Sequence, residues 1–261
     1  MVDQYPILQL APEQVTPELR ALFLTTDPAA LRCQAVLDGH AAGKIFTDHP
    51  ETPSWGVLQE AAFGSIYLGG EVQAGLLHHL IGSLRKNGEV LAGLSEGDPR
   101  WQLFPSTADY TGYTLEFTDC ESGQLLPPLP VGCELHRLDS SLGKQILDRN
   151  LLIRMFGSIQ QALEWGYGLC LLRDEALLCE AFAGPAANGV IEIGVETQPH
   201  YFHQGFAFVT CAHLIHTMEE LGYLTYWNCA KGNIASAMLA RKLGYRSEKE
   251  YRLLAWSRLD S

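Results

Sequence analysis

Apolar and polar residues recur along the chain with the periods of both strands and helices. In residues 190–196 every second side chain is apolar, which is typical of a strand with one buried face. Residues 206–218 carry apolar side chains at an approximately helical spacing, and Gly222 follows as a stop signal. A second strand at 224–229 and a short helix at 233–243 come next. This segment therefore predicts a strand, a turn, a helix, a strand and a helix.

The same two periods extend an α/β pattern over the rest of the chain. Strands are predicted at residues 43–46, within 55–68, and at 89–94, 113–117, 134–138, 167–172 and 176–183. Helices are predicted at residues 12–25, with Thr16 as a candidate N-cap, at 71–86, and within 140–166 with a break near Gly157.

A stretch rich in proline and glycine, residues 119–132, lacks both periods and predicts a linker. With 261 residues, the chain is also longer than a usual single domain. We therefore expect an N-terminal α/β domain at residues 1–125 and a second domain at residues 130–261.

Gly205 stands where the predicted strand 190–196 passes into the predicted helix. A helix entered through a glycine presents unpaired backbone N–H groups and the positive end of its dipole, an arrangement that suits a pyrophosphate. An ordinary strand–turn–helix connection is the alternative interpretation of the same spacing.

Two motifs in this region together resemble those of the GNAT superfamily of acyl-CoA-dependent N-acetyltransferases. The first, Val-x-Pro-x-x-[Arg/Gln]-x-x-Gly-x-[Gly/Ala], is matched at Thr197, Pro199, Phe202, Gly205 and Ala207. The second, Asn-x-x-[Ala/Ser] before a helix that ends in Leu-Gly-[Phe/Tyr], is matched at Asn233, Ser236, Leu243, Gly244 and Tyr245. The resemblance covers residues 133–256 well, and with Trp227 and Cys229 it extends to the two-domain bacterial GNAT proteins.

This resemblance implies an α/β fold with a C-terminal GNAT-like mixed sheet flanked by helices. The smaller N-terminal α/β domain is then interpretable as a diverged GNAT-like half. The implied co-substrate is acetyl-CoA, with its pantetheine along the backbone of the strand and its pyrophosphate on the turn. The implied contact residues are Val195, Glu196, Thr197, Phe202, His203, Gln204, Gly205, Phe206, Ala207, Asn233 and Ser236.

Two positions depart from the family pattern. Phe202 stands where the family has arginine or glutamine, so a donor or a positive charge near the pyrophosphate is missing. The backbone amides that form most of the cradle need no particular side chain. Ala240 stands where many members have a tyrosine that protonates the departing thiolate. These departures weaken the predicted cofactor site and remove the common general acid.

The implied reaction is direct attack of a primary amine on the thioester, without a covalent enzyme intermediate. A lysine-like amine with a pKa near 10.4 is only about 0.04% neutral at pH 7, so a proton acceptor is useful. Glu192 and Glu196 lie on the strand that would face the thioester, and Glu192 is preferred because its Glu-Ile-Gly setting resembles several GNAT groups. A solvated or structurally paired carboxylate is the alternative role for each.

The charge balance excludes one class of partner. The chain has 18 basic and 30 acidic residues, a net charge of −12. Binding to nucleic acid normally requires the opposite sign, so we expect no nucleic-acid partner. An acidic surface is compatible with a small cationic amine substrate but does not identify one.

Cysteine and histidine spacing predicts neither a disulfide framework nor a metal site. The seven cysteines form no Cys-x-x-Cys pair, which indicates reduced thiols in a cytoplasmic protein. His213 and His216 share a helix face but lack a carboxylate or cysteine to complete a ligand set.

No apolar run reaches eighteen residues, and the N-terminus does not resemble a signal peptide. A homodimer is the candidate oligomer.

Two other functions stay open at this level. Phe202 and Ala240 favour a non-catalytic acyl-CoA-binding or regulatory protein, and a ligand-free interaction module would require both motifs to be accidental. The N-terminal half is expected to shape the acceptor site, with Trp55, Phe63 and Tyr67 lining a cleft; the alternative is that these aromatic side chains fill a core.

Overall fold

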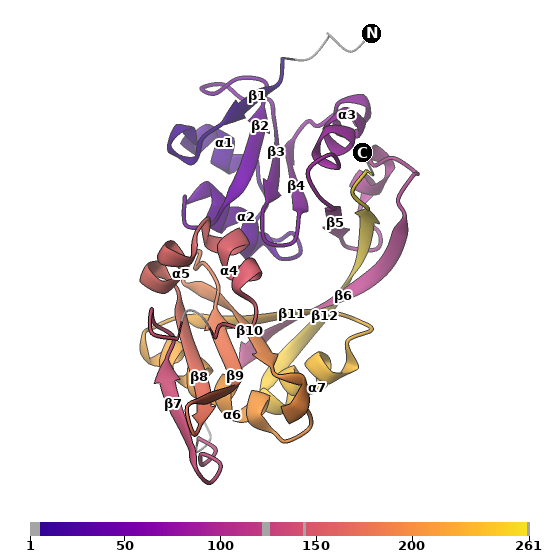
Figure 1. The fold of residues 1–261 in the computed structure, drawn as a ribbon. Coiled ribbons are helices and arrows are strands. Elements are labelled where there is room, and N and C mark those ends of the chain that lie inside the picture. The colour runs from indigo at the N-terminus through magenta and orange to yellow at the C-terminus, as the bar shows by residue number, and fades with distance from the viewer. Residues whose placement is uncertain (1–5, 122–125, 143–144, 260–261) are drawn as a thin grey trace. The chain divides into compact units, whose positions relative to one another are not determined.

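A computed structural model describes residues 6–121, 126–142 and 145–259. The chain divides into two compact units, one formed by residues 1–114 with 250–261 and the other by residues 115–249. We call them unit 1 and unit 2 (Figure 1). This division differs from the expected domains at 1–125 and 130–261, because the C-terminal residues return to unit 1.

The first half of the sequence contains three α-helices, two short 3-10 helices and six strands within its described residues. In chain order these are β1 (Leu8–Leu10), a 3-10 helix (Pro12–Gln14), α1 (Pro17–Ala21), α2 (Ala30–Leu37), β2 (Gly43–Thr47), β3 (Trp55–Glu60), β4 (Ser65–Gly70), α3 (Ala74–Leu84), β5 (Val90–Leu94), a 3-10 helix (Pro99–Leu103) and β6 (Tyr110–Cys120).

The second half has a similar order of helices and strands, and most of its elements are longer. They are β7 (Cys133–Arg137), α4 (Arg149–Phe156), α5 (Ile159–Trp165), β8 (Tyr167–Arg173), β9 (Ala176–Ala183), β10 (Val190–Thr197), a 3-10 helix (Pro199–Tyr201), α6 (Phe206–Glu220), β11 (Leu224–Ala230), α7 (Ile234–Leu243) and β12 (Tyr245–Trp256).

Each half therefore follows one plan: a strand, two helices, three strands, a helix, a strand, a helical segment and a long strand. In unit 1 the strand order is β1-β2-β3-β4-β5-β12, and in unit 2 it is β6-β11-β10-β9-β8-β7. The pairs β4–β5 and β10–β11 are parallel, whereas β2–β3, β3–β4, β8–β9 and β9–β10 are antiparallel. The predicted mixed α/β fold with two GNAT-like halves is confirmed.

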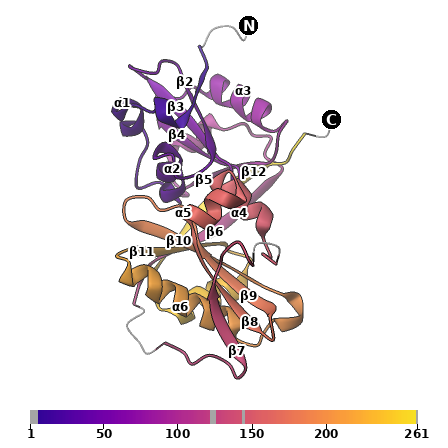
Figure 2. The ribbon, with the colours of Figure 1, turned by 60° about the vertical axis from the view of Figure 1, so that its left-hand side comes forward.

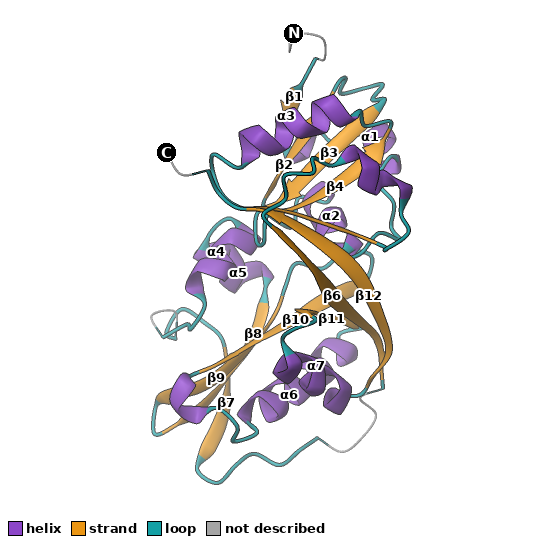
Figure 3. Ribbon diagram, turned by 90° about the vertical axis from the view of Figure 1, so that its right-hand side faces the viewer, coloured by secondary structure: helices purple, strands orange, loops and turns teal. Residues whose placement is uncertain are grey.

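The long last strand of each half contributes to both units (Figure 3). Residues 115–120 of β6 belong to unit 2, and residues 250–256 of β12 belong to unit 1. There β12 pairs antiparallel with β5, from Arg252 opposite Leu94 to Trp256 opposite Val90. The sheet of unit 1 thus takes a strand from the C-terminal part of the chain, and this strand lies between β5 and β6.

The sheet of unit 1 is buried on both faces, because alternate side chains enter different cores. Val57 and Ile66 pack in a cluster with α3, whereas Leu58 lies in a second cluster that contains residues of α1 and α2. Trp55 and Tyr67, expected to line an acceptor cleft, are buried in these clusters. The cleft interpretation is wrong for these two residues, and the alternative interpretation is confirmed for them, because their rings fill the core.

In unit 2, α6 packs against β8, β9, β10 and β11 (Figure 2). Ala181 and Ala183 of β9 share a buried cluster with Leu214 of α6. Glu180 and Phe182 alternate with them and so face the opposite side of the sheet. On that side, Glu180 binds the segment that leads into α4 through the backbone N–H groups of Leu147 and Asp148.

Several predicted boundaries need correction. The predicted helix 12–25 is a 3-10 helix followed by the short α1, although Thr16 caps α1 as expected by accepting the Leu19 N–H at 3.2 Å. The predicted break at Gly157 is confirmed, since this residue has a φ of 89° between α4 and α5. Residues 122–125 of the predicted linker lie outside the described residues.

Burial of α6 provides a test of the unit 2 core. Leu214 is fully buried against the sheet, whereas Leu221 at the end of the same helix is 60% exposed. We expect Leu214→Ala to lower the free energy of unfolding by about 2–5 kcal/mol, because it removes buried methyl groups and leaves a cavity. Leu221→Ala should change it by no more than about 0.5 kcal/mol. Urea unfolding of both variants measures the difference; equal losses would contradict this account of the core.

Candidate functional site

Strands β10 and β11 separate soon after they pair. Their parallel register joins Val190 to Leu224, Ile191 to Thr225 and Glu192 to Tyr226. From Ile193 to Thr197, the register of β10 continues only with β9 in the described chain, as far as Cys179. The backbone of residues 193–197 therefore has one edge that β11 does not cover, with hydrogen-bonding groups spaced to pair with an extended amide-containing ligand.

The turn after β10 presents a row of backbone N–H groups. Gly205 is the N-cap of α6 with a φ of 82°, and His203 before it has a φ of 62°. Within the described chain, the N–H groups of residues 203–208 have no acceptor, and the Val209 N–H donates to the Gly205 carbonyl at 3.2 Å. A Cβ added at Gly205 would lie in open space. The turn thus fits an anionic group at the positive end of a 15-residue helix.

The side chains of this turn supply little charge. Phe202 is half exposed and lies edge-on to the His203 ring, with 6.4 Å between the ring centroids. Gln204 donates its side-chain amide to the His200 carbonyl at 3.4 Å. Phe206 turns inward and is buried beside Cys179. The predicted cradle residues 202–207 are consecutive, and their exposed polar groups are mainly backbone amides.

The corresponding junction of unit 1 lacks these features. Helix α3 begins after Gln73, which has an extended backbone with φ −91° and ψ 142°. No glycine with positive φ caps it, and the preceding Glu71 carries a negative charge. Of these two corresponding helix starts in the described chain, only that of α6 has the glycine turn.

The second motif lies at the start of α7. The side-chain oxygen of Asn233 accepts the Ser236 N–H at 3.1 Å and so caps the helix, while its exposed side-chain NH₂ group points to no acceptor in the described chain. The Ser236 hydroxyl accepts the Trp227 indole N–H at 3.0 Å. Asn233 is thus available to a ligand, whereas Ser236 mainly fixes a core tryptophan.

The two candidate carboxylates differ in accessibility. Glu192 is only 7% exposed and lies on the face of β10 opposite to α6. Glu196 lies on the same face nearer the end of the strand, and it is exposed. With Thr197, Leu147 and Asp148 it lines a pocket of about 270 Å³. An incoming molecule therefore reaches Glu196 more readily than Glu192.

Two acidic residues, Glu196 and Asp148, line this pocket, and the buried Glu180 lies next to Glu196 on β9. Burial raises the pKa of Glu196, and the negative charge of Asp148 raises it further. Glu180 is opposite Glu196 in the β9–β10 register, and burial raises its pKa as well. Its carboxylate accepts the N–H groups of Leu147 at 2.9 Å and Asp148 at 3.0 Å. A carboxylate with a raised pKa is a stronger base, so Glu196 suits proton abstraction.

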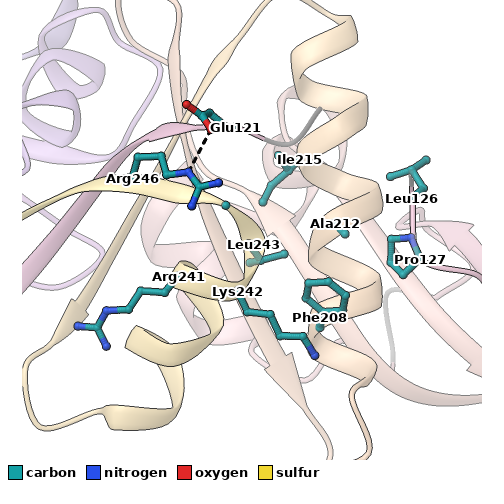
Figure 4. Close-up of a pocket in the computed structure, with 11 residues that line it drawn as sticks. Glu121, Leu126, Pro127, Phe208, Ala212, Ile215, Arg241, Lys242, Leu243 and Arg246 are labelled. Carbon is teal, nitrogen blue, oxygen red and sulfur yellow. Dashed lines mark hydrogen bonds and ion pairs between the residues drawn. The ribbon is translucent and has the colours of Figure 1, made fainter. Parts of the chain in front are cut away.

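A second pocket of about 190 Å³ lies between α6 and α7 (Figure 4). Phe208, in the first turn of α6, forms part of its wall, and the Lys242 ammonium lies 4.1 Å from the centroid of that ring. Two other cations at this pocket are paired, Arg241 with Glu248 at 2.8 Å and Arg246 with Glu121 at 3.1 Å.

Ala240 is completely buried in the cluster between the sheet and α7, so this position supplies no general acid. Among the described residues, no group of three or more His, Cys, Asp or Glu side chains is placed to hold a metal ion. In the same part of the chain, every helix is too short or too polar to cross a membrane.

Sequence patterns did not identify Asp148 or Glu180 as residues at or beside this pocket. Asp148 carries a local signal, because an aspartate before Leu151 is a typical helix N-cap, and it does accept the Leu151 N–H at 3.0 Å. Its proximity to Glu196 has no signal in the sequence, since 47 intervening residues separate them.

Comparison with solved structures agrees with the fold. A structure of a GCN5-related N-acetyltransferase-like protein from Streptococcus suis is 20% identical, with a TM-score of 0.66, and the match covers 94% of this chain and all of that one. A tandem GNAT protein from the clavulanic acid biosynthesis pathway is 12% identical, with a TM-score of 0.63 and coverage of 98% and 99%. An acetyltransferase of the GNAT family from Colwellia psychrerythraea is also 12% identical, with a TM-score of 0.59 and coverage of 96% and 99%.

Sequence comparison gives a more local match and a family. The chain is 26% identical over 125 residues to the uncharacterised N-acetyltransferase YdfB of Bacillus subtilis. The aligned segment spans 47% of this chain and 48% of that protein. The model of the GNAT acetyltransferase family matches residues 21–254, nearly the whole chain. The chain therefore belongs to the GNAT acetyltransferase family.

Proposed function

We propose that the protein transfers an acetyl group from acetyl-CoA to a small primary amine by direct attack. The observation that carries the proposal is the site where β10 leaves β11 and a row of unpaired amides begins α6. The free strand edge suits the amides of pantetheine, and the turn suits the pyrophosphate. Asn233 donates to the pantetheine arm from the other side of the opening.

The amine approaches through the pocket lined by Glu196 and Asp148. Most of a lysine-like amine is protonated at neutral pH, so the acidic pocket first attracts the ammonium form and Glu196 then accepts a proton from it. The neutral nitrogen attacks the thioester carbonyl, whose oxygen is polarised by a backbone N–H of β10. The C–S bond breaks, and the amide nitrogen loses its second proton to solvent.

No side chain at position 240 protonates the departing thiolate. Thiols have a pKa of about 8.5, so a thiolate is a moderately good leaving group near neutral pH and solvent provides its proton. The complete burial of Ala240 favours one second candidate function, an acyl-CoA-binding protein without transferase activity. Release of free thiol from acetyl-CoA with a panel of primary amines distinguishes the two.

The turn at Gly205 gives a prediction about cofactor binding. We expect Gly205→Glu to weaken CoA binding at least about tenfold, because a carboxylate near the pyrophosphate is repelled by roughly 1–4 kcal/mol at 4 Å. Gly205→Asn is the control, since asparagine tolerates positive φ and adds no charge. Calorimetry measures both. If the glutamate variant and the parent have equal affinity for CoA, the pyrophosphate does not bind at this turn. If the parent does not bind CoA at millimolar concentration, CoA is not its cofactor.

The accessible carboxylate gives a prediction about catalysis. We expect Glu196→Gln to lower kcat by about 100-fold, as for loss of a general base, with CoA affinity nearly unchanged. Glu192→Gln is the comparison on the same strand, and it should have the smaller effect on kcat because Glu192 is buried. Steady-state kinetics with an accepted amine decides between them. The opposite ranking would assign the proton transfer to Glu192.

The charge of Asp148 gives a prediction about pH dependence. Because Asp148 raises the pKa of Glu196, we expect Asp148→Asn to lower that pKa and move the acidic limb of kcat/KM to lower pH. Asparagine also caps a helix, so α4 should keep its N-terminus. A pH profile of parent and variant tests the shift. An acidic limb at the same pH in both proteins would show that Asp148 does not tune the base.

A further inference from the structure

Arg173, at the end of β8, holds a cation beside the start of α6. Its guanidinium carbon lies 5.5 Å from the ring centroid of Phe206, the first residue of that helix. The Nε atom is buried without a hydrogen-bond partner. In the described chain no carboxylate lies within ion-pair distance of Arg173, even though Asp174 and Glu175 follow it directly.

Among the described residues, Arg173 is the only arginine with a buried side-chain nitrogen that has no hydrogen-bond partner. A guanidinium has five donors, and a buried donor without an acceptor carries a desolvation cost. Five other arginines of the described chain have carboxylate partners, Arg20, Arg85, Arg100, Arg241 and Arg246, whereas Arg137 and Arg252 lie over aromatic rings as Arg173 does. The unmatched donor of Arg173 is thus suited to an anion that is not part of the chain.

The directions of the strands place Arg173 at the end of the sheet where the turn begins. β8 and β10 are both antiparallel to β9, so they run in the same direction and their C-terminal ends lie at the same end of the sheet. Cys179 of β9 is opposite Leu171 on one side and Thr197 on the other. Arg173 lies two residues beyond Leu171, level with the residues that follow Thr197 and lead into the turn.

We propose that Arg173 binds the pyrophosphate of acetyl-CoA and replaces the donor that is missing at Phe202. This inference rests on the proposed use of acetyl-CoA. The guanidinium is held at the side of the first helical turn by Phe206, and its fork of donors matches phosphate oxygens. The amides of residues 203–208 and Arg173 then contact the same group from two elements.

The test is the affinity for CoA, measured by calorimetry on the full chain without an acceptor amine. We expect Arg173→Met to weaken binding at least about tenfold, because a charge-assisted contact to phosphate is lost. The salt dependence of the affinity should also fall, since one fewer phosphate charge is neutralised. Phe202→Arg, added to Arg173→Met, should restore most of the affinity by returning a cation to the turn.

Arg137→Met is the matched control. Arg137 also lies over an aromatic ring, with its guanidinium carbon 4.7 Å from the centroid of Tyr167. Arg137 lies at one end of β7 and pairs with Leu169 of β8. Cys133 lies at the other end of β7 and pairs with Arg173. This variant removes the same charge and the same kind of stacking at the other edge of the sheet, and it should bind CoA like the parent.

The outcomes separate this inference from the proposed function. If the parent does not bind CoA, the proposed function fails. If the parent and Arg173→Met bind CoA equally, Arg173 has no role and the proposed function stands. Equal losses in the Arg173 and Arg137 variants would overturn the inference in favour of a general charge effect. Should Arg173→Met not fold, Arg173→Lys is measured instead; it keeps the charge but loses the fork, and affinity equal to that of the parent would overturn bidentate binding.

Discussion

Backbone N–H and C=O groups in a sheet need hydrogen-bond partners, and β10 has more of these groups than its neighbouring strands can pair with. Beyond Glu192 the register of this strand continues with β9 alone, because β11 diverges after Tyr226. The rest of the site follows from this one separation. It opens the strand edge beside Val195 and Thr197, directs the chain into the turn before Gly205, and leaves Asn233 across the opening. Under the proposed function, the amides of the pantetheine arm complete the pairing that the sheet leaves unfinished.

Periodicity located this region well because its elements have one buried face each. The alternation in β10 and the glycines that flank α6 are local signals, and the predicted strand, turn and helices lie where expected. Two of the elements that the patterns did not predict, α2 and β12, were missed for opposite reasons. Helix α2 is buried nearly all round, so it has no polar face to set a helical period. Strand β12 begins with the polar run 246–250, whose exposed side chains hide the strand until the buried residues near Trp256.

The catalytic part of the site was less predictable, because it depends on contacts between distant segments. Glu196 was a candidate from its strand alone. Its raised pKa comes from burial and from Asp148, which reaches the pocket only because the buried Glu180 holds the backbone of Leu147 and Asp148. Three carboxylates close together oppose one another, and two backbone N–H groups offset part of that cost for Glu180. Such an arrangement is set by the packing of α4 on the sheet and has no spacing rule in the sequence.

The two departures from the family pattern have different chemical consequences. A missing acid at Ala240 is tolerable, because a thiolate with a pKa near that of cysteine leaves without a proton supplied by the protein. A missing cation at Phe202 is more serious, because a pyrophosphate keeps its negative charge throughout and this chain is strongly acidic. The surroundings of Ala240 and of the turn at Phe202 agree with this difference. Position 240 is closed by a fully buried methyl group, whereas an unpaired guanidinium at Arg173 lies against the first residue of α6. Under the proposed function, the site thus lacks an acid that the chemistry can do without, and Arg173 provides a positive charge beside the start of α6, where the proposed pyrophosphate needs one.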